Sequence, residues 1–411
     1  MTLPGTDEAK HAGMSPRGPL APLAALTFAR VAYGVQFQSV GAVGPAMVAD
    51  LGLAYASLGT LVGAYSALGL ALSLPAGWMI ARLGDRRVVL AGLGLMALGG
   101  LLLAVAPGFG AALAGRLVSG AGAMLLIVAL PTIVAGRFAG AALPAAMGTL
   151  LAGYPLGIGL GFVALPLAGS WRAAMAATAA LALLALAAAA VTLARSSGEA
   201  TGTRRGFRLP AGEVALVIAA GLVWGCPNAG FATLLGFAPA FFVGQGMPGQ
   251  AAGALVSLVA FATVPTGPIG GWLVGRLPRP LWGIAAGIAL TAAAMALLAQ
   301  GVAPAILLVT AGVALGTVAG PIVALPAAVL APERRAVGMG LFWLAFFAPM
   351  MLLPPLAGLA RDLTGDAAAP LGAAAGFAAL GLPALAAYAG LRRSVIAAPA
   401  APPPAAGGAP R

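Results

Sequence analysis

The chain has 411 residues, of which 61% are hydrophobic and only 7% are charged, and its formal net charge is +12 at pH 7. Its mean hydropathy is +1.04. A water-soluble fold of this length needs more polar surface, so the composition excludes a soluble protein and predicts one that crosses a membrane many times.

Twelve apolar stretches are long enough to cross a bilayer, because about 20 helical residues span a hydrocarbon core of about 30 Å. They must be helices, since hydrocarbon offers no partners for exposed backbone and the alternating segments of an outer-membrane barrel are missing. The predicted fold class is therefore an all-α polytopic membrane protein. The spans are expected at 22–48, 55–80, 88–106, 110–134, 143–168, 173–194, 213–242, 251–275, 281–300, 304–330, 337–360 and 370–391.

The joins divide these spans into two groups of six. Residues 1–19 are a polar tail without the apolar core of a signal peptide, and 20–194 are expected to form the first six-helix bundle. The central loop, 195–211, carries four arginines and precedes a second bundle at 212–393. The Pro/Ala-rich tail at 394–411 is expected to be disordered.

The basic residues predict the orientation of the chain. If the N-terminus is cytoplasmic, 17 of the 21 Lys and Arg residues lie in cytoplasmic joins, and only Arg172 and Arg361 lie outside. The remaining two, Arg30 and Arg116, fall within spans. Because the arginines are scattered over many short loops, we expect contact with anionic lipid and no nucleic-acid binding. The Ala-, Gly- and Arg-rich usage suggests a GC-rich bacterial genome, hence the inner membrane, with both termini cytoplasmic.

An internal repeat relates the two groups of spans. GWMIARL at 77–83 returns as GWLVGRL at 271–277, 194 residues later, and IVALP at 127–131 returns at 322–326, 195 residues later. A third match joins spans 1 and 7. A parallel duplication of six-helix units is typical of transporters whose substrate site lies between the halves near the midplane.

The join after span 2, GWMIARLGDRR, resembles the loop signature of the major facilitator superfamily. The matching positions are Gly77, Gly84, Arg86 and Arg87. Ala81 stands where the family usually has an aspartate, and Asp85 is the acid nearest to it. The resemblance implies two pseudo-symmetric bundles, alternating access, and a conformational role for this loop.

Two further likenesses concern particular spans. RLVSGAG, from Arg116 to Gly122, is similar to the superfamily's arginine-then-glycine motif, which implies a role for Arg116 in proton coupling. The alternative is a structural hub that donates hydrogen bonds to carbonyl groups of adjacent helices. Span 1 together with the loop also resembles the branch that includes cyanate and nitroimidazole transporters.

Span 1 offers the principal candidate for substrate binding. Arg30 lies within it, Tyr33 shares its helical face, and Gln38 lies at the edge of that face. A charged side chain inside a span is costly and usually faces the protein interior, so this face could bind an anionic or strongly polar group. The alternative is an arginine that snorkels to cytoplasmic head groups.

Three residues elsewhere complete the candidate site. Asn228 follows Pro227 in span 7, where a broken helix would expose carbonyls to substrate, although a plain kink is the alternative. Tyr154 and Trp343 could line the cavity with their polar edges, and ordinary helix packing is the alternative for both.

The acids indicate which substrates to expect. All nine lie in tails, in loops or at span ends, whereas an antiporter for cationic drugs normally needs a carboxylate within the membrane. The sequence therefore favours a secondary active transporter of a small organic anion or polar solute, with proton or counter-anion coupling. A proton-coupled multidrug or metabolite efflux antiporter is the alternative. We expect a monomer without enzymatic activity, cofactor or metal, since Cys226 is the single cysteine.

Overall fold

The computed structural model describes residues 20–72, 82–140, 142–193, 209–331 and 334–397. Within these ranges the secondary structure is helical, and twelve stretches are long and apolar enough to cross a membrane. The helices of the first half are α1 (Leu20–Phe37), α2 (Ser39–Ala42), α3 (Gly44–Leu51), α4 (Tyr55–Leu72), α6 (Asp85–Ala104), α7 (Phe109–Arg137), α8 (Ala142–Ala164), η2 (Leu165–Ala168) and α9 (Trp171–Thr192). Those of the second half are α10 (Ala211–Gly244), α11 (Gly249–Gly275), α12 (Pro280–Leu298), α13 (Pro304–Val323), η3 (Pro326–Ala328), α14 (Arg335–Thr364), α15 (Ala369–Ala379) and α16 (Gly381–Ala397).

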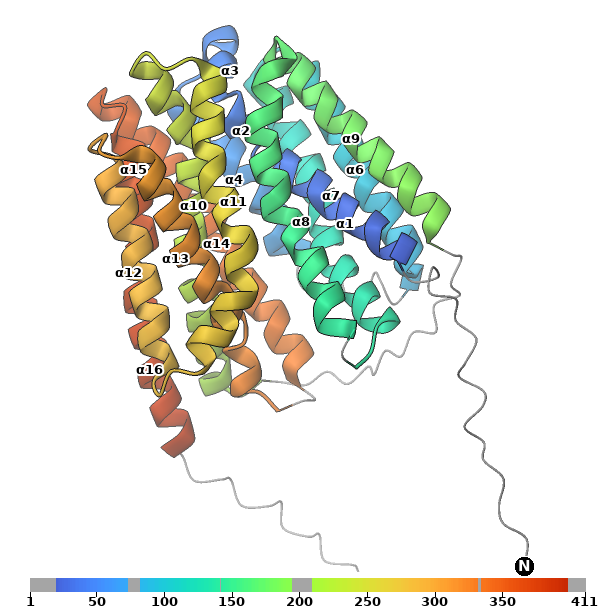
Figure 1. The fold of residues 1–411 in the computed structure, drawn as a ribbon, viewed down its shortest axis with the longest axis vertical. Coiled ribbons are helices and arrows are strands. Elements are labelled where there is room, and N and C mark those ends of the chain that lie inside the picture. The colour runs from blue at the N-terminus through green and yellow to red at the C-terminus, as the bar shows by residue number, and fades with distance from the viewer. Residues whose placement is uncertain (1–19, 73–81, 141, 194–208, 332–333, 398–411) are drawn as a thin grey trace, which may run out of the picture.

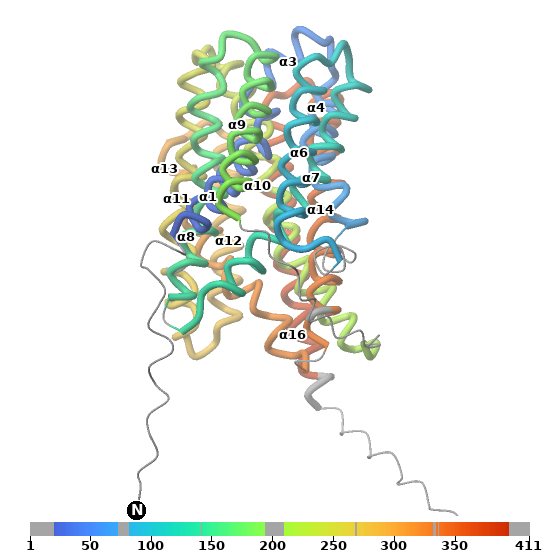
Figure 2. Tube along the Cα trace, turned by 90° about the vertical axis from the view of Figure 1, so that its right-hand side faces the viewer, coloured from blue at the N-terminus to red at the C-terminus, as the bar shows by residue number. Residues whose placement is uncertain are grey.

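These helices form one upright bundle, which confirms the predicted fold class (Figure 1). We call the end that holds α3 the distal end and the end at which α16 finishes the proximal end (Figure 1). The tube in Figure 2 shows the same long axis from the side, with α3 again at one end and α16 at the other.

Two of the predicted spans are interrupted. The stretch expected as one helix at 22–48 is three helices, because the chain leaves helical geometry at Gln38 and again at Val43. Pro45 follows the second break and cannot donate a backbone hydrogen bond to the preceding turn. The span expected at 370–391 divides between α15 and α16, just before Pro383, whose ring would clash with a carbonyl one turn earlier.

Each half of the chain packs mainly within itself. In the first half α6 packs against α7 and α9, and α1 packs against α8. In the second half α10 packs against α14 and α15, and α11 packs against α13. The halves meet along two seams, which are formed by α4 with α14 and by α8 with α11.

The two seams are built alike. A Cβ atom on Gly59 of α4 would lie 2.2 Å from the carbonyl oxygen of Pro354, and one on Gly253 of α11 would lie 2.3 Å from that of Phe162. Only glycine allows helices to approach so closely. Gly59 and Gly253 are 194 residues apart, the offset of the sequence repeat. The duplication is therefore expressed in the packing between the halves.

Candidate functional site

Arg30, on α1, is partly buried, and no described residue supplies it with a counter-ion. Its Nε and Nη1 atoms are buried and have no hydrogen-bond partner in the described part of the chain. Its Cζ atom lies 5.3 Å from the ring centroid of Tyr33 and 5.5 Å from that of Tyr154, so the cation is held by two aromatic faces. Its aliphatic stem lies against Gly153 of α8, where a Cβ would be 3.2 Å from the Arg30 Cβ.

Four aromatic rings form a cluster beside this cation. Tyr33 stacks on Tyr154 at a centroid distance of 4.9 Å and on Tyr65 at 6.1 Å. Phe37 meets Tyr65 and Tyr154 edge-on at 5.5 and 5.6 Å. Three helices, α1, α4 and α8, thus contribute one aromatic cluster, and the predicted residues Arg30, Tyr33 and Tyr154 come together in it.

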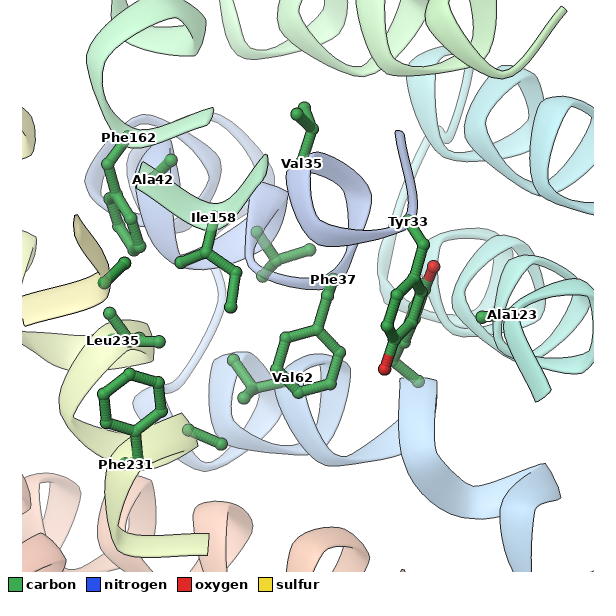
Figure 3. Close-up of a cluster of buried hydrophobic side chains, with 14 of the residues drawn as sticks. Tyr33, Val35, Phe37, Ala42, Val62, Ala123, Ile158, Phe162, Phe231 and Leu235 are labelled. Atoms are coloured by element: carbon green, nitrogen blue, oxygen red, sulfur yellow. The ribbon is translucent and has the colours of Figure 1, made fainter. Parts of the chain in front are cut away.

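Apolar side chains next to this cluster pack against the second half of the chain. In Figure 3, Phe37 of α1 points toward Val62 of α4, while Phe231 and Leu235 of α10 lie beside them. A Cβ on Gly236 of α10 would lie 3.0 Å from the Val62 side chain, so the halves are in contact at this level. The cluster therefore lies close to the boundary between the halves.

Arg116 occupies the hub position that was one of its two predicted roles. Its Nε donates to the carbonyl oxygen of Leu61 at 2.8 Å, and its Nη1 and Nη2 donate to those of Gln36 and Phe37, both at 2.9 Å. The residue is fully buried, and its Cζ lies 4.3 Å from the ring centroid of Tyr65. Because α1 ends at Phe37, carbonyls of its last turn need partners, and Arg116 supplies them.

Gln36 is a buried neighbour of Arg116 that the sequence analysis did not name. It points away from Arg30 into the first half, where its Nε2 donates to the carbonyl of Met96 at 2.9 Å and its Oε1 accepts from the Tyr65 hydroxyl at 3.3 Å. Gln36 and Arg116 together fix the position at which span 1 breaks. A sequence signal existed, since a glutamine within an apolar span is itself unusual.

Gln38 lies at that break, between α1 and α2. It is 2% exposed, and neither its Nε2 nor its Oε1 has a partner among the described residues. An enclosed amide without partners in an apolar environment is costly, so this side chain has unused capacity for a ligand or a water molecule.

The two candidate residues of the second half, Asn228 and Trp343, do not join the aromatic cluster around Arg30 in the described part of the chain. The Asn228 Nδ2 donates to the carbonyl of Trp224 one turn earlier, at 2.8 Å, within its own helix. Trp343 packs among Phe346 and Phe347 with centroid distances of 5.2 and 6.0 Å. No hydrogen bond or ring contact joins either residue to Arg30 in the ranges the structure describes.

Trp343 nevertheless touches the other half of the chain. With Phe347 it lines a cavity of about 10 Å³ whose other walls are residues of the first half. Those residues are Leu72, Met124, Ile127 and Val128. The cavity is at the lower limit for one water molecule, so the halves are tightly apposed here.

The acidic side chains that the structure describes lie at helix ends or, for Asp366, in the loop between α14 and α15. The Asp50 carboxylate accepts from the Trp171 Nε1 at 2.9 Å and pairs with Arg172, and these donors hold the pKa of Asp50 below its usual value of 3.8. Glu213 pairs with Arg334 at 2.5 Å. Neither pair contributes a carboxylate to the aromatic cluster around Arg30.

The loop motif is only partly within the described residues, since Gly77 lies outside them. Gly84 has a φ of +77°, which favours glycine, and Asp85 begins α6, where a negative charge is favourable. The Arg86 Nη2 donates to the carbonyl of Ala190 at the end of α9, at 3.1 Å, and Arg87 is exposed. The contact that Arg86 makes thus stays within the first half.

A larger cavity, of about 310 Å³, opens at the distal end between the halves. The first half contributes Pro45, Pro166 and Trp171, and the second half contributes Pro239 and Gln250. The three prolines mark the α2–α3 break, η2 and the last turns of α10. Among the described residues, no group of three or more His, Cys, Asp or Glu side chains is arranged to hold a metal ion.

Comparison with known proteins identifies the fold family. The sequence profile of the Major Facilitator Superfamily matches residues 26–354. No curated protein matches the chain at a significant level.

Solved transporter structures share the fold at low sequence identity. A bacterial homologue of the human lysosomal transporter Spinster, inward-facing and occupied, is 17% identical with a TM-score of 0.75, over 93% of this chain and 98% of that one. The peptide transporter POT in complex with sulfate is 17% identical with a TM-score of 0.72, over 90% and 95%. A point mutant of the nucleoside transporter NupG is 14% identical with a TM-score of 0.71, over 90% and 99%. With twelve candidate spans and a profile match over most of its length, the chain belongs to the Major Facilitator Superfamily of transporters.

Proposed function

We propose that this protein is a secondary active transporter that moves a small organic anion or polar solute by alternating access. The observation that carries the proposal is Arg30, whose Nε and Nη1 are enclosed without partners among the described residues, beside Tyr33 and Tyr154. A buried cation that lacks a counter-ion is costly, and a substrate carboxylate or similar anion would supply one. Transport would then require the site to open to each side in turn.

The aromatic surroundings narrow the substrate further. Rings of Tyr33, Phe37, Tyr65 and Tyr154 offer stacking faces to a planar or apolar body, while Arg30 binds the charged end. Small carboxylates, cyanate-like anions and nitroaromatics are therefore the classes to test first, and the resemblance to cyanate and nitroimidazole transporters supports the same choice. Proton or counter-anion coupling completes the proposal.

Other parts of the proposal follow from charge. We place the protein in a bacterial inner membrane as a monomer, with its proximal end and both termini in the cytoplasm. Export of cations in exchange for protons receives less support, because the described acids lie at helix ends or in a loop and away from Arg30.

The test is counterflow in proteoliposomes with a panel of radiolabelled anions, each compared with and without an imposed pH gradient. Replacing Arg30 with Gln should abolish uptake of the transported anion while the protein still inserts and purifies. Arg393, which is exposed near the end of α16 and lies outside the loop motif, gives the matched control, and its replacement by Gln should leave uptake unchanged. Undiminished uptake by the Arg30→Gln protein would refute the role of Arg30.

A further inference from the structure

The distal end of the α4–α14 seam is tied by one carboxylate. Asp362, in the last turn of α14, accepts hydrogen bonds from the backbone N–H groups of Tyr55 at 2.9 Å and Ala56 at 2.8 Å, each with a different oxygen. These N–H groups belong to the first turn of α4. Asp362 therefore caps a helix of the first half although it belongs to the second half.

The position of Asp362 is unfavourable within its own helix. The C-terminal end of an α-helix carries partial negative charge, so a carboxylate in its last turn is destabilising there. The first turn of α4 carries partial positive charge and has unpaired N–H donors, which is where a carboxylate is stabilising. Asp362 thus gains its favourable contacts only while the two halves touch at the distal end.

Two other residues of α14, Arg361 and Gly358, also contact Tyr55 at the start of α4. The Arg361 Cζ lies 3.6 Å from the ring centroid of Tyr55, and a Cβ on Gly358 would lie 2.0 Å from the Tyr55 carbonyl oxygen. Tyr55 is therefore contacted by Asp362 at its N–H group, by Arg361 at its ring and by Gly358 at its carbonyl group.

The related seam lacks this arrangement. Tyr55 corresponds by the repeat offset of 194 residues to Gly249, which has no ring for an arginine to cover. Gly249 and Gln250 instead line the distal cavity of about 310 Å³. Within the described residues, the polar tie is thus confined to the α4–α14 seam.

We propose that Asp362 is a latch that stabilises the state in which the distal end is closed, by capping α4 across the boundary between the halves. This inference rests on the alternating access of the proposed function. When the distal end opens, α4 loses two caps and Asp362 returns to water beside the unfavourable end of its own helix. The latch therefore shifts the equilibrium toward the distally closed state without contacting substrate.

The test measures how often the distal seam opens. Val62, on α4, is 3% exposed and lies against Gly236 of α10, so a cysteine there reacts with a polar maleimide only when the halves separate. The experiment uses full-length protein in detergent with Cys226 replaced by Ser, and it compares Asp362 with Asp362→Ala. Loss of an N-cap shifts an equilibrium about fivefold, so the labelling rate of Val62→Cys should rise about fivefold.

Two graded controls separate the latch from general loosening. Asp362→Asn retains one acceptor oxygen and should give an intermediate rate. Asp366, whose Oδ1 caps only Ala368 in its own loop at 2.8 Å, supplies the matched acid, and Asp366→Ala should leave the rate unchanged. A cysteine at Val105, which is 73% exposed, should react equally fast in every variant.

The outcomes distinguish the latch from the transport mechanism. Equal, measurable labelling at position 62 in the Asp362 and Asp362→Ala proteins would overturn the latch and leave alternating access standing. No labelling in any variant would mean that the distal end does not open, which would overturn both. An equal increase with Asp366→Ala would also reject a specific role for Asp362.

Discussion

Replacements of Arg116 can show whether its hydrogen bonds or its positive charge have the larger effect on the free energy of unfolding. Its three hydrogen bonds to carbonyls of Leu61, Gln36 and Phe37 bind the end of α1 to α4 and α7. Hydrogen bonds between membrane helices contribute about 0.6 kcal/mol on average and at most about 1.7, so the three together contribute about 2–5 kcal/mol. Burying the charge costs about 2.5–3.5 kcal/mol. The two contributions nearly cancel.

This near-balance predicts an unusual order of stability. Arg116→Met loses the bonds and also the cost of the charge, so its free energy of unfolding should change by about 2 kcal/mol or less. Arg116→Lys keeps the charge but can reach only about one of the three carbonyls, and it should lose about 1–3 kcal/mol. The conservative replacement should thus be no more stable than the apolar one.

The assay is reversible unfolding in mixed micelles, followed by tryptophan fluorescence. Arg86 is the matched control, since its Nη2 makes a single bond to the Ala190 carbonyl at 3.1 Å and the side chain is only partly buried. Arg86→Lys should lie within about 0.5 kcal/mol of the unmodified protein. An Arg116→Lys protein as stable as the parent would refute the hub geometry.

Two more predictions concern the distal end. Gly358→Ala adds a Cβ atom 2.0 Å from the Tyr55 carbonyl oxygen, so it should open the distal seam and speed maleimide labelling of Val62→Cys. Gly372→Ala adds its Cβ atom in open space and should leave the labelling rate unchanged. Equal rates in the two variants would contradict the close approach at Gly358. The Asp50 carboxylate, whose pKa is lowered by hydrogen bonds from Arg172 and Trp171, should stabilise the fold fully above about pH 4 and lose this contribution as the pH falls through the still lower folded-state pKa. Asp50→Asn should therefore melt at a lower temperature than the parent at pH 6, with a gap that narrows below pH 4; a gap independent of pH would contradict the pairing.

The sequence was sufficient for the architecture because hydrophobic length alone specifies a membrane span. It also placed Arg30 and Tyr33 together, since residues three apart share a helical face. Tyr154 was named only as a residue that could line the cavity, and its place beside Arg30 came from the structure. These inferences depend on local spacing, which the sequence displays directly.

Contacts between segments that are distant in the sequence could not be predicted from spacing within a span. At the break of span 1 near Gln38, Arg116 of another helix donates hydrogen bonds to the carbonyl groups of Gln36 and Phe37. The residues of span 1 alone do not predict these donors. The cap that Asp362 places on α4 joins residues 307 apart. Such pairings depend on how the two halves meet, which is set by tertiary packing rather than by the pattern within a span.

The most direct measurement is equilibrium binding of matched carboxylate and amide pairs, such as benzoate and benzamide, to the parent protein and to Arg30→Gln. An anion held by the partly buried guanidinium of Arg30 should bind the parent more tightly than its neutral amide does. Arg30→Gln should reduce that preference about tenfold or more while leaving the affinity for the amide unchanged. A preference for the carboxylate that survives in Arg30→Gln would contradict the account, because some other group would then bind the anion.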